Sequence, residues 1–143
     1  MLQYQQQVAE ITTATGIQCP PQSAQVIQRD ATRWVFNPIT ANCFEPVAIR
    51  NPPRLARAVS PQEECSCWAL SMHDTVAASL TAFAYVEKSF RKAKKTLGTH
   101  VAVATINGVH GISTLSDPNG HFDLHPYVGG PFLTTFVINS AIP

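Results

Sequence analysis

Apolar residues recur along this chain with two different periods. Between Val76 and Phe90 they are spaced three and four residues apart, which predicts one long amphipathic helix over 74–96 with Asp74 as its N-cap. Elsewhere, alternating apolar and polar residues or a compact apolar run predict strands. The expected strands are 24–36, 65–72, 100–106, 109–115, 121–125 and 133–138. The helix should bury Val76, Leu80, Phe83 and Phe90, and expose Lys88, Lys92 and Lys95.

Turn-forming residues separate these elements. Asn107-Gly108 predicts a tight hairpin between the strands on either side of it, and Asp117–Gly120 predicts a type I turn before the strand at 121. A short helix is expected over 2–15. The proline-rich stretch 37–61 has no regular pattern and is expected to be a long loop.

Together these elements indicate one α+β domain, with a mainly antiparallel sheet packed against one long amphipathic helix. Residues 1–20 would form a peripheral helix and linker, and residues 24–138 would form the core. A chain of 143 residues is long enough to bury a hydrophobic core of its own.

Composition and charge narrow the functional classes. Hydrophobic residues make up 45% and charged residues 13%, which is typical of a globular protein, and a net charge of +1 gives no overall attraction to nucleic acid or membrane. The chain contains no signal peptide and no apolar run long enough to span a bilayer, so we expect a cytoplasmic protein that does not contact a membrane. Its four cysteines should then be thiols.

Side chains that can bind a metal or transfer a proton are most concentrated at 121–125. On a strand, His121, Asp123 and His125 share one face, while Phe122 and Leu124 share the other. Three such side chains could ligate zinc with an open fourth position, but no further ligand is evident by spacing, and no metal is expected. The two histidines could instead act as general acid and base, for example in RNA cleavage, with the lysine-rich stretch 88–95 holding phosphates.

Three stretches resemble blocks of the ADP-ribosyltransferase superfamily. Ser66 and Ser71 lie on an expected strand that leads into Asp74-Thr75-Val76-Ala77-Ala78, which is similar to the family's second block of serines followed by a helix of small residues. The earlier strand with Arg29 resembles the first block, where an arginine or histidine holds NAD. The stretch Gly120–Pro126 lies where the third block places a catalytic glutamate.

This resemblance implies a split NAD-binding sheet, glycosyl transfer from NAD and a place in a bacterial toxin or defence system. Arg29 would grip the pyrophosphate or ribose of NAD, and Ser66 or Ser71 would order its nicotinamide half. No glutamate follows Glu87, so Asp123 would take the catalytic role, assisted by His121 or His125. The chain also resembles a small uncharacterised bacterial family, which implies no function.

A different class remains open from the residues alone. All these features also fit a non-catalytic module that binds a protein or a nucleic acid through its polar face. The two classes differ in one structural expectation: an NAD-using enzyme should bring Arg29, Ser71 and Asp123 together in one cleft.

Overall fold

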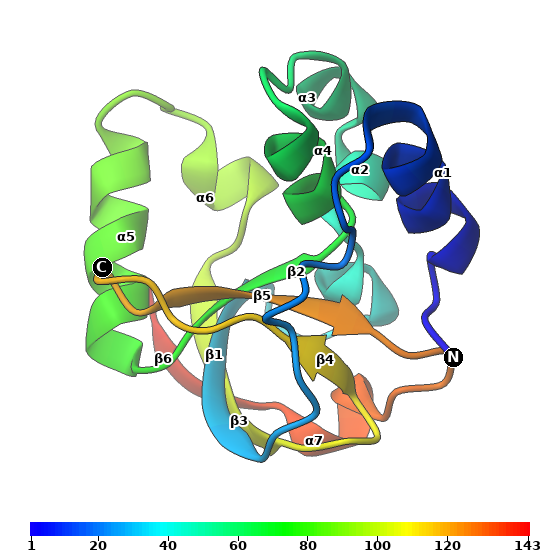
Figure 1. Ribbon diagram of the computed structural model, residues 1–143. Coiled ribbons are helices and arrows are strands. Elements are labelled where there is room, and N and C mark those ends of the chain that lie inside the picture. The colour runs from blue at the N-terminus through cyan, green and yellow to red at the C-terminus, as the bar shows by residue number, and fades with distance from the viewer.

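Six antiparallel strands form one sheet in the order β4-β5-β2-β1-β3-β6 in the computed structural model, which describes residues 1–143 (Figure 1). The strands are β1 Arg29–Val35, β2 Leu70–His73, β3 His100–Ile106, β4 Gly111–Ser113, β5 His121–Pro126 and β6 Val137–Ala141. The helices are α1 Gln5–Thr15, α2 Val47–Arg50, α3 Pro52–Ala56, α4 Pro61–Cys67, α5 Val76–Glu87, α6 Ala93–Thr96 and α7 Phe132–Thr135, and a 3-10 helix, η1, spans Ala41–Phe44. The expected α+β class with an antiparallel sheet is confirmed.

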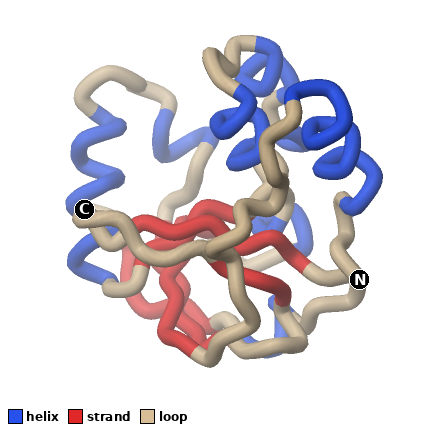
Figure 2. The backbone as a smooth tube through the Cα atoms, viewed as in Figure 1, coloured by secondary structure: helices blue, strands red, loops and turns tan.

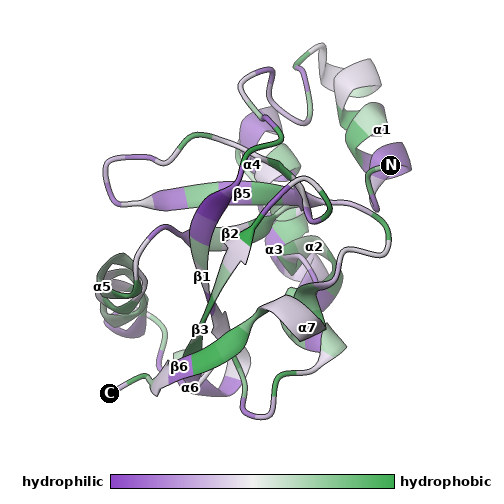
Figure 3. Cartoon of the chain, turned by 90° about the horizontal axis from the view of Figure 1, so that it is seen from below, coloured by the Kyte–Doolittle hydropathy of each residue, from purple (hydrophilic) through white to green (hydrophobic).

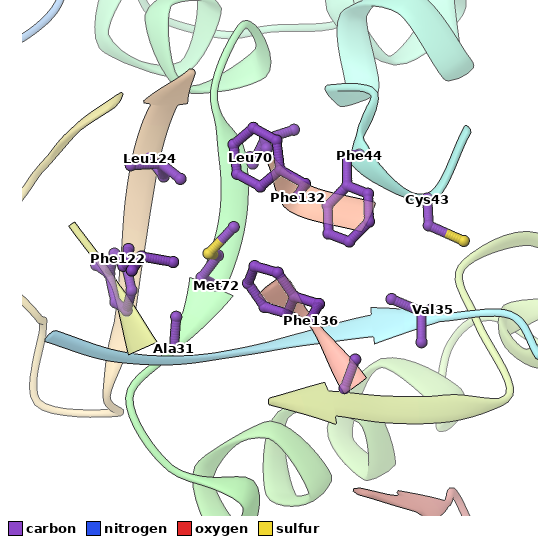
Figure 4. Close-up of a cluster of buried hydrophobic side chains, with 12 residues drawn as sticks. Ala31, Val35, Cys43, Phe44, Leu70, Met72, Phe122, Leu124, Phe132 and Phe136 are labelled. Atoms are coloured by element: carbon purple, nitrogen blue, oxygen red, sulfur yellow. The ribbon is translucent and has the colours of Figure 1, made fainter. Parts of the chain in front are cut away.

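One face of the sheet carries the main hydrophobic core (Figure 4). Alternation along β2 and β5 turns Leu70, Met72, Phe122 and Leu124 toward this face, where all four are buried. Aromatic side chains from η1 and α7 cover them, with Phe44 stacked 5.2 Å from the ring of Phe132. Burial of these apolar and aromatic side chains is the dominant favourable contribution to the stability of the sheet.

The other face of the sheet is covered at its two ends and open between them. At one end α5 packs Phe83 edge-on against Trp34 of β1, with 5.0 Å between the ring centroids. At the other end α1 and α4 bury Val8 and Ile11. The helices accordingly form two groups beside the central strands, α5 with α6 and α1 with α2 to α4 (Figure 2). The polar residues of the central strands lie between the two groups.

A disulfide between Cys19 and Cys65 fastens the segment after α1 to α4. The expectation of four thiols is therefore wrong for this pair, whereas Cys43 and Cys67 are buried free cysteines. Sequence spacing could not reveal the pair, because the two cysteines are 46 residues apart and meet only when α1 packs on α4. None of the helices is both long enough and apolar enough to cross a membrane.

The expected long helix over 74–96 is two helices. Thr75, not Asp74, caps α5 by accepting a hydrogen bond from the Ala78 amide, and α5 ends at Glu87. Phe83 is fully buried as expected, but Phe90 lies beyond α5 and is 36% exposed. The four-residue spacing from Val86 to Phe90 therefore does not reflect a continued helix, because the chain turns at 88–92 before α6 begins.

The expected strand over 65–72 is also divided. Ser60 accepts a hydrogen bond from the Glu63 amide and Pro61 occupies the first turn, so a helix, α4, continues to Cys67 before β2 starts at Leu70. A serine cap followed by proline is a known helix start, and the apolar run that follows it conceals this signal.

Three further differences concern the loops and the end of the sheet. Asn107-Gly108 does not close a hairpin, because β3 pairs with β1 and β6 while β4 pairs with β5. The Asp117–Gly120 turn belongs to the true hairpin, β4–β5. The stretch 37–61 contains η1, α2 and α3 instead of one long loop, and 133–138 is mostly α7 before β6.

Candidate functional site

Four polar side chains form a patch on the two neighbouring strands β2 and β5. In the antiparallel register Ser71 lies opposite Asp123 and His73 lies opposite His121. Hydrophilic and hydrophobic residues alternate along β5, so His121, Asp123 and His125 project from the face opposite the main core (Figure 3). We call Ser71, His73, His121 and Asp123 the polar patch.

His121 is the centre of the polar patch. The Ser71 hydroxyl oxygen lies 2.7 Å from Nε2 of His121, a hydrogen-bond distance, and an oxygen of Asp123 lies 3.7 Å from the same nitrogen. On the other side of the ring, a carboxylate oxygen of Asp117 is 3.9 Å from Nδ1. A serine hydroxyl and two carboxylates thus meet around the His121 imidazole, which is an arrangement able to transfer protons or stabilise positive charge.

Asp123 is held in a largely buried position, with 17% of its side chain exposed. Burial raises the pKa of Asp123, and a hydrogen bond from the Ser66 hydroxyl of α4 partly opposes that rise. The backbone amide of Asp123 donates to the Thr114 hydroxyl, which fixes the strand at this point. A carboxylate that is both shielded from water and rigidly placed interacts strongly with charge that develops beside it.

His73 is the most deeply buried member of the polar patch and stacks on Trp34, with 5.7 Å between the ring centroids. Burial, and then the proximity of His121, lower the pKa of His73 to about 4. His73 is therefore neutral at physiological pH. It presents a flat, uncharged ring beside the indole of Trp34, whose Nε1 donates to the Ser79 carbonyl.

The turn before β5 brings Asp117 to His121. One oxygen of Asp117 accepts hydrogen bonds from the amides of Asn119 and His121, which leaves the other oxygen facing the imidazole. Gly120 has a φ of +77°, and a Cβ there would lie 2.5 Å from a carboxylate oxygen of Asp74. A side chain at this position would strain the backbone and displace the Asp74 carboxylate at the start of α5.

Two hollows open on either side of the polar patch, and Trp34, Ser71 and His121 line both of them. The first, of about 360 Å³, lies between the two helix groups and is lined by residues of α2, α4 and α6. The second, of about 880 Å³, lies between α5 and the Asp117–Gly120 turn. Both volumes are in the range of small-molecule sites.

The first hollow contains buried positive charge. Arg33 of β1 is 8% exposed and donates three hydrogen bonds, to the carbonyl oxygens of Cys43, Ser71 and Glu45. No carboxylate pairs with it, and burial together with repulsion by Arg50 lowers its pKa to about 10. A buried guanidinium with only neutral partners favours an anion in the adjoining hollow.

Arg29 does not lie at the polar patch. Its guanidinium is 3.6 Å from the ring centroid of Phe122, which faces the main core, and it donates to the Thr114 carbonyl and the Ser116 hydroxyl. Because Phe122 and Asp123 project to opposite faces of β5, Arg29 is separated from Asp123 by the sheet. The expected meeting of Arg29, Ser71 and Asp123 in one cleft is thus wrong for Arg29, whereas Ser71 and Asp123 do meet.

His125 is also absent from the polar patch, although it shares the strand face with His121 and Asp123. It is 2% exposed and lies under α1 beside Tyr4, Val8 and Trp68. Burial lowers the pKa of His125 to about 4, and its Nε2 has no hydrogen-bond partner. His125 is therefore a residue of the covered end of the sheet, not of the cleft.

Several site residues escaped the sequence prediction. His73 follows Ser71 by two residues and so shares its strand face, a signal that was present in the sequence. Asp117 precedes His121 by four residues in a turn, a spacing that carries no particular signal. Trp34 and Arg33 lie on β1, and only the strand order shows that they border β2.

No group of three or more histidine, cysteine, aspartate or glutamate side chains is arranged to hold a metal ion. Comparisons with protein-family models, curated proteins and solved structures found no match to this chain. The chemistry of the polar patch and its hollows must therefore carry any functional conclusion.

Proposed function

We propose that this chain is an NAD-using enzyme similar to ADP-ribosyltransferases, with its active site at the polar patch. The observation that carries the proposal is spatial. The three stretches that resemble the family's blocks form three neighbouring strands, β1, β2 and β5, at the middle of the sheet. They bring Ser71 and His121 together where the two hollows meet, with a carboxylate oxygen of Asp123 3.7 Å from Nε2 of His121.

The roles of the residues follow from their surroundings. Cleavage of the bond between the ribose C1′ and nicotinamide develops positive charge on the ribose, and the shielded carboxylate of Asp123 lies where it can steady that charge. The electron pair of the broken bond leaves on nicotinamide. An acceptor then forms the new bond to C1′ and gives its proton to the Ser71 hydroxyl, which passes its own proton to Nε2 of His121, while Asp117 orients the ring from the Nδ1 side.

The two hollows suit the two ends of such a substrate. Trp34 and the neutral ring of His73 offer a stacking surface in the second hollow, which fits the flat nicotinamide. Arg33 and Arg50 lie in the first hollow and supply the positive charge that phosphates need. Arg29 is replaced in this role, because it lines neither hollow and instead contacts Phe122 and Thr114. Ser66 supports Asp123 and does not contact nicotinamide in this arrangement.

The test combines calorimetric binding of NAD with an NAD-consumption assay on Asp123→Asn and its matched control Asp30→Asn. Asp30 is exposed on β1 and lies outside both hollows. Turnover should fall about 100-fold or more in Asp123→Asn while binding largely survives, because the carboxylate acts on the transition state. Failure of the wild type to bind NAD would refute the proposal and favour a non-catalytic binding module. The toxin or defence role that the resemblance implies stays a prediction.

A second candidate rests on the hydrogen bond between Ser71 and His121. A serine hydroxyl 2.7 Å from an imidazole nitrogen, with a carboxylate beyond the ring, also suits a nucleophile that forms an acyl-enzyme. A fluorophosphonate probe separates the two candidates. Covalent labelling of the wild type that is absent in Ser71→Ala would favour acyl transfer, and no labelling together with NAD consumption would favour the first candidate.

A further inference from the structure

The positive charge of this chain is concentrated in one short segment. Residues 88–95, which we call the basic segment, contain all four lysines of the chain and one arginine. With Glu87 included, this stretch has five basic residues and one acidic residue, a formal charge of +4. The remainder has five arginines against eight acidic residues, a formal charge of −3, so the net charge of +1 conceals a strong asymmetry.

Four of the five basic residues in the basic segment are exposed and lack acidic partners, whereas Lys94 is half-buried and donates to an oxygen of Pro143. Lys88, Arg91, Lys92 and Lys95 are all exposed, and none of them forms an ion pair with a carboxylate. Like charges that crowd together without counter-charges repel one another, and an anionic partner would relieve that repulsion.

The basic segment borders the proposed active site on both sides. Tyr85 and Val86, just before it, line the second hollow, and Phe90 and Leu97 line the first. In Figure 1 the segment runs from the end of α5 into α6, and α6 stands between α5 and the other helix group. An anion bound along this segment therefore lies at the entrance to the polar patch.

Aromatic side chains accompany the basic ones. Tyr85 is 74% exposed, and Phe90, between Lys88 and Arg91, is 36% exposed. Exposed aromatic rings beside lysines and arginines are the combination that binds single-stranded nucleic acids, where bases stack and phosphates pair with cations. An acidic peptide would use the charges but would gain little from the rings.

We propose that the basic segment, with Tyr85 and Phe90, binds a single-stranded nucleic acid and presents it to the polar patch as the acceptor. The acceptor role rests on the proposed function, whereas the binding itself does not. A single strand is required, because a base inside a duplex cannot enter a hollow beside β2 and β5 without being unstacked.

The experiment measures fluorescence anisotropy of labelled 12-nucleotide RNA and DNA strands, a duplex of the same sequence and a polyglutamate peptide, over a series of salt concentrations. No NAD is added, so the result is independent of the catalytic proposal. The single strands should bind best. The combined variant Lys88→Gln, Arg91→Gln, Lys92→Gln and Lys95→Gln should reduce the slope of log affinity against log salt by about 3, at about 0.7 per lost charge.

Two single variants provide the matched comparison. Lys92→Gln should weaken binding, whereas Arg57→Gln, which removes an exposed charge outside the basic segment, should not. Tyr85→Ala should weaken binding about fivefold or more without changing the salt slope, because it removes stacking and not charge.

The outcomes separate the two proposals. No binding of single strands by the wild type, equal effects of Lys92→Gln and Arg57→Gln, or stronger binding of polyglutamate would overturn this inference even if NAD is consumed. Binding with the expected salt slope supports the nucleic-acid surface. The acceptor role is supported when NAD consumption then attaches ADP-ribose to the labelled strand, and is overturned when the strand stays unmodified while NAD is consumed.

Discussion

Ser71 and His121 form a hydrogen bond of 2.7 Å between side chains on neighbouring strands. The two residues are 50 positions apart in sequence, and the antiparallel pairing of β2 with β5 sets their separation. When the serine hydroxyl donates to Nε2, the proton of the neutral imidazole is on Nδ1, which faces Asp117. The hydrogen bond thus selects the tautomer whose Nδ1–H faces the Asp117 carboxylate.

Ser71→Ala should remove this selection without disturbing the fold, because the Ser71 side chain is exposed. We expect NAD consumption to fall at least about tenfold and the melting temperature to change by less than about 2 °C. Nitrogen-15 NMR of the imidazole should show a change in the tautomer ratio of His121. Ser89→Ala, at an exposed serine beyond α5, is the control and should leave both measurements unchanged.

Arg33→Met should destabilise the protein by about 3 kcal/mol or more, because it leaves three carbonyl oxygens without their donor. Urea denaturation measures the loss. Arg57→Met, at an exposed arginine, should change the free energy of unfolding by less than about 0.5 kcal/mol. Equal effects at the two positions would mean that Arg33 does not support β1 and β2 as described.

His125→Phe should flatten the dependence of stability on pH. The pKa of His125 is about 4 in the folded chain and about 6.5 when unfolded, so between these values the unfolded state binds more protons and stability falls as pH falls. At pH 4 this cost approaches about 3 kcal/mol, and above pH 6.5 it vanishes. His73 and Asp123 titrate in both proteins, so the difference between wild type and variant isolates His125.

The measurement is urea denaturation of both proteins at pH 7 and pH 4.5. The variant should gain stability relative to the wild type at the lower pH, because phenylalanine has no ring nitrogen to be protonated or left without a partner. Parallel loss of stability in the two proteins would show that His125 is not the buried neutral group described here.

Alkylation of the unfolded chain without reductant should add two groups, at Cys43 and Cys67, and four groups after reduction. Intact mass spectrometry reads the number directly. Serine substitution of Cys43 should remove one of the two additions and leave the disulfide intact, whereas Cys65→Ser should free Cys19. Four additions without reductant would contradict the Cys19–Cys65 bond.

Alternation along a strand predicted the direction of its side chains, and contacts between elements were beyond it. Alternation along 121–125 placed His121 and Asp123 on one face correctly, because side-chain direction on a strand follows from local geometry. The same alternation put His125 with them, and it could not show that α1 covers that end of the strand. Burial by a distant element is a tertiary property that no local period contains.

The choice of arginine failed for a related reason. Arg29 and Arg33 are four residues apart on β1 and project from the same side of that strand. The segments that lie next to β1, however, differ from one end of the strand to the other. Near Arg29 the neighbouring chain is the β4–β5 region, whereas near Arg33 it is η1 and β2. Sequence indicated that an arginine on this strand would matter, and only the topology distinguishes the two.

The strands beneath the first hollow and the helices around it differ in their resistance to local unfolding. The floor of this hollow is made by β1, β2 and β5, central strands whose backbone amides should exchange with solvent only during extensive unfolding. The first hollow is walled by α2, α4 and α6, of four, seven and four residues, too short to be stable apart from their packing. Local opening of these walls can therefore admit a bulky ligand, while the distance between Ser71 and His121 stays fixed beneath it.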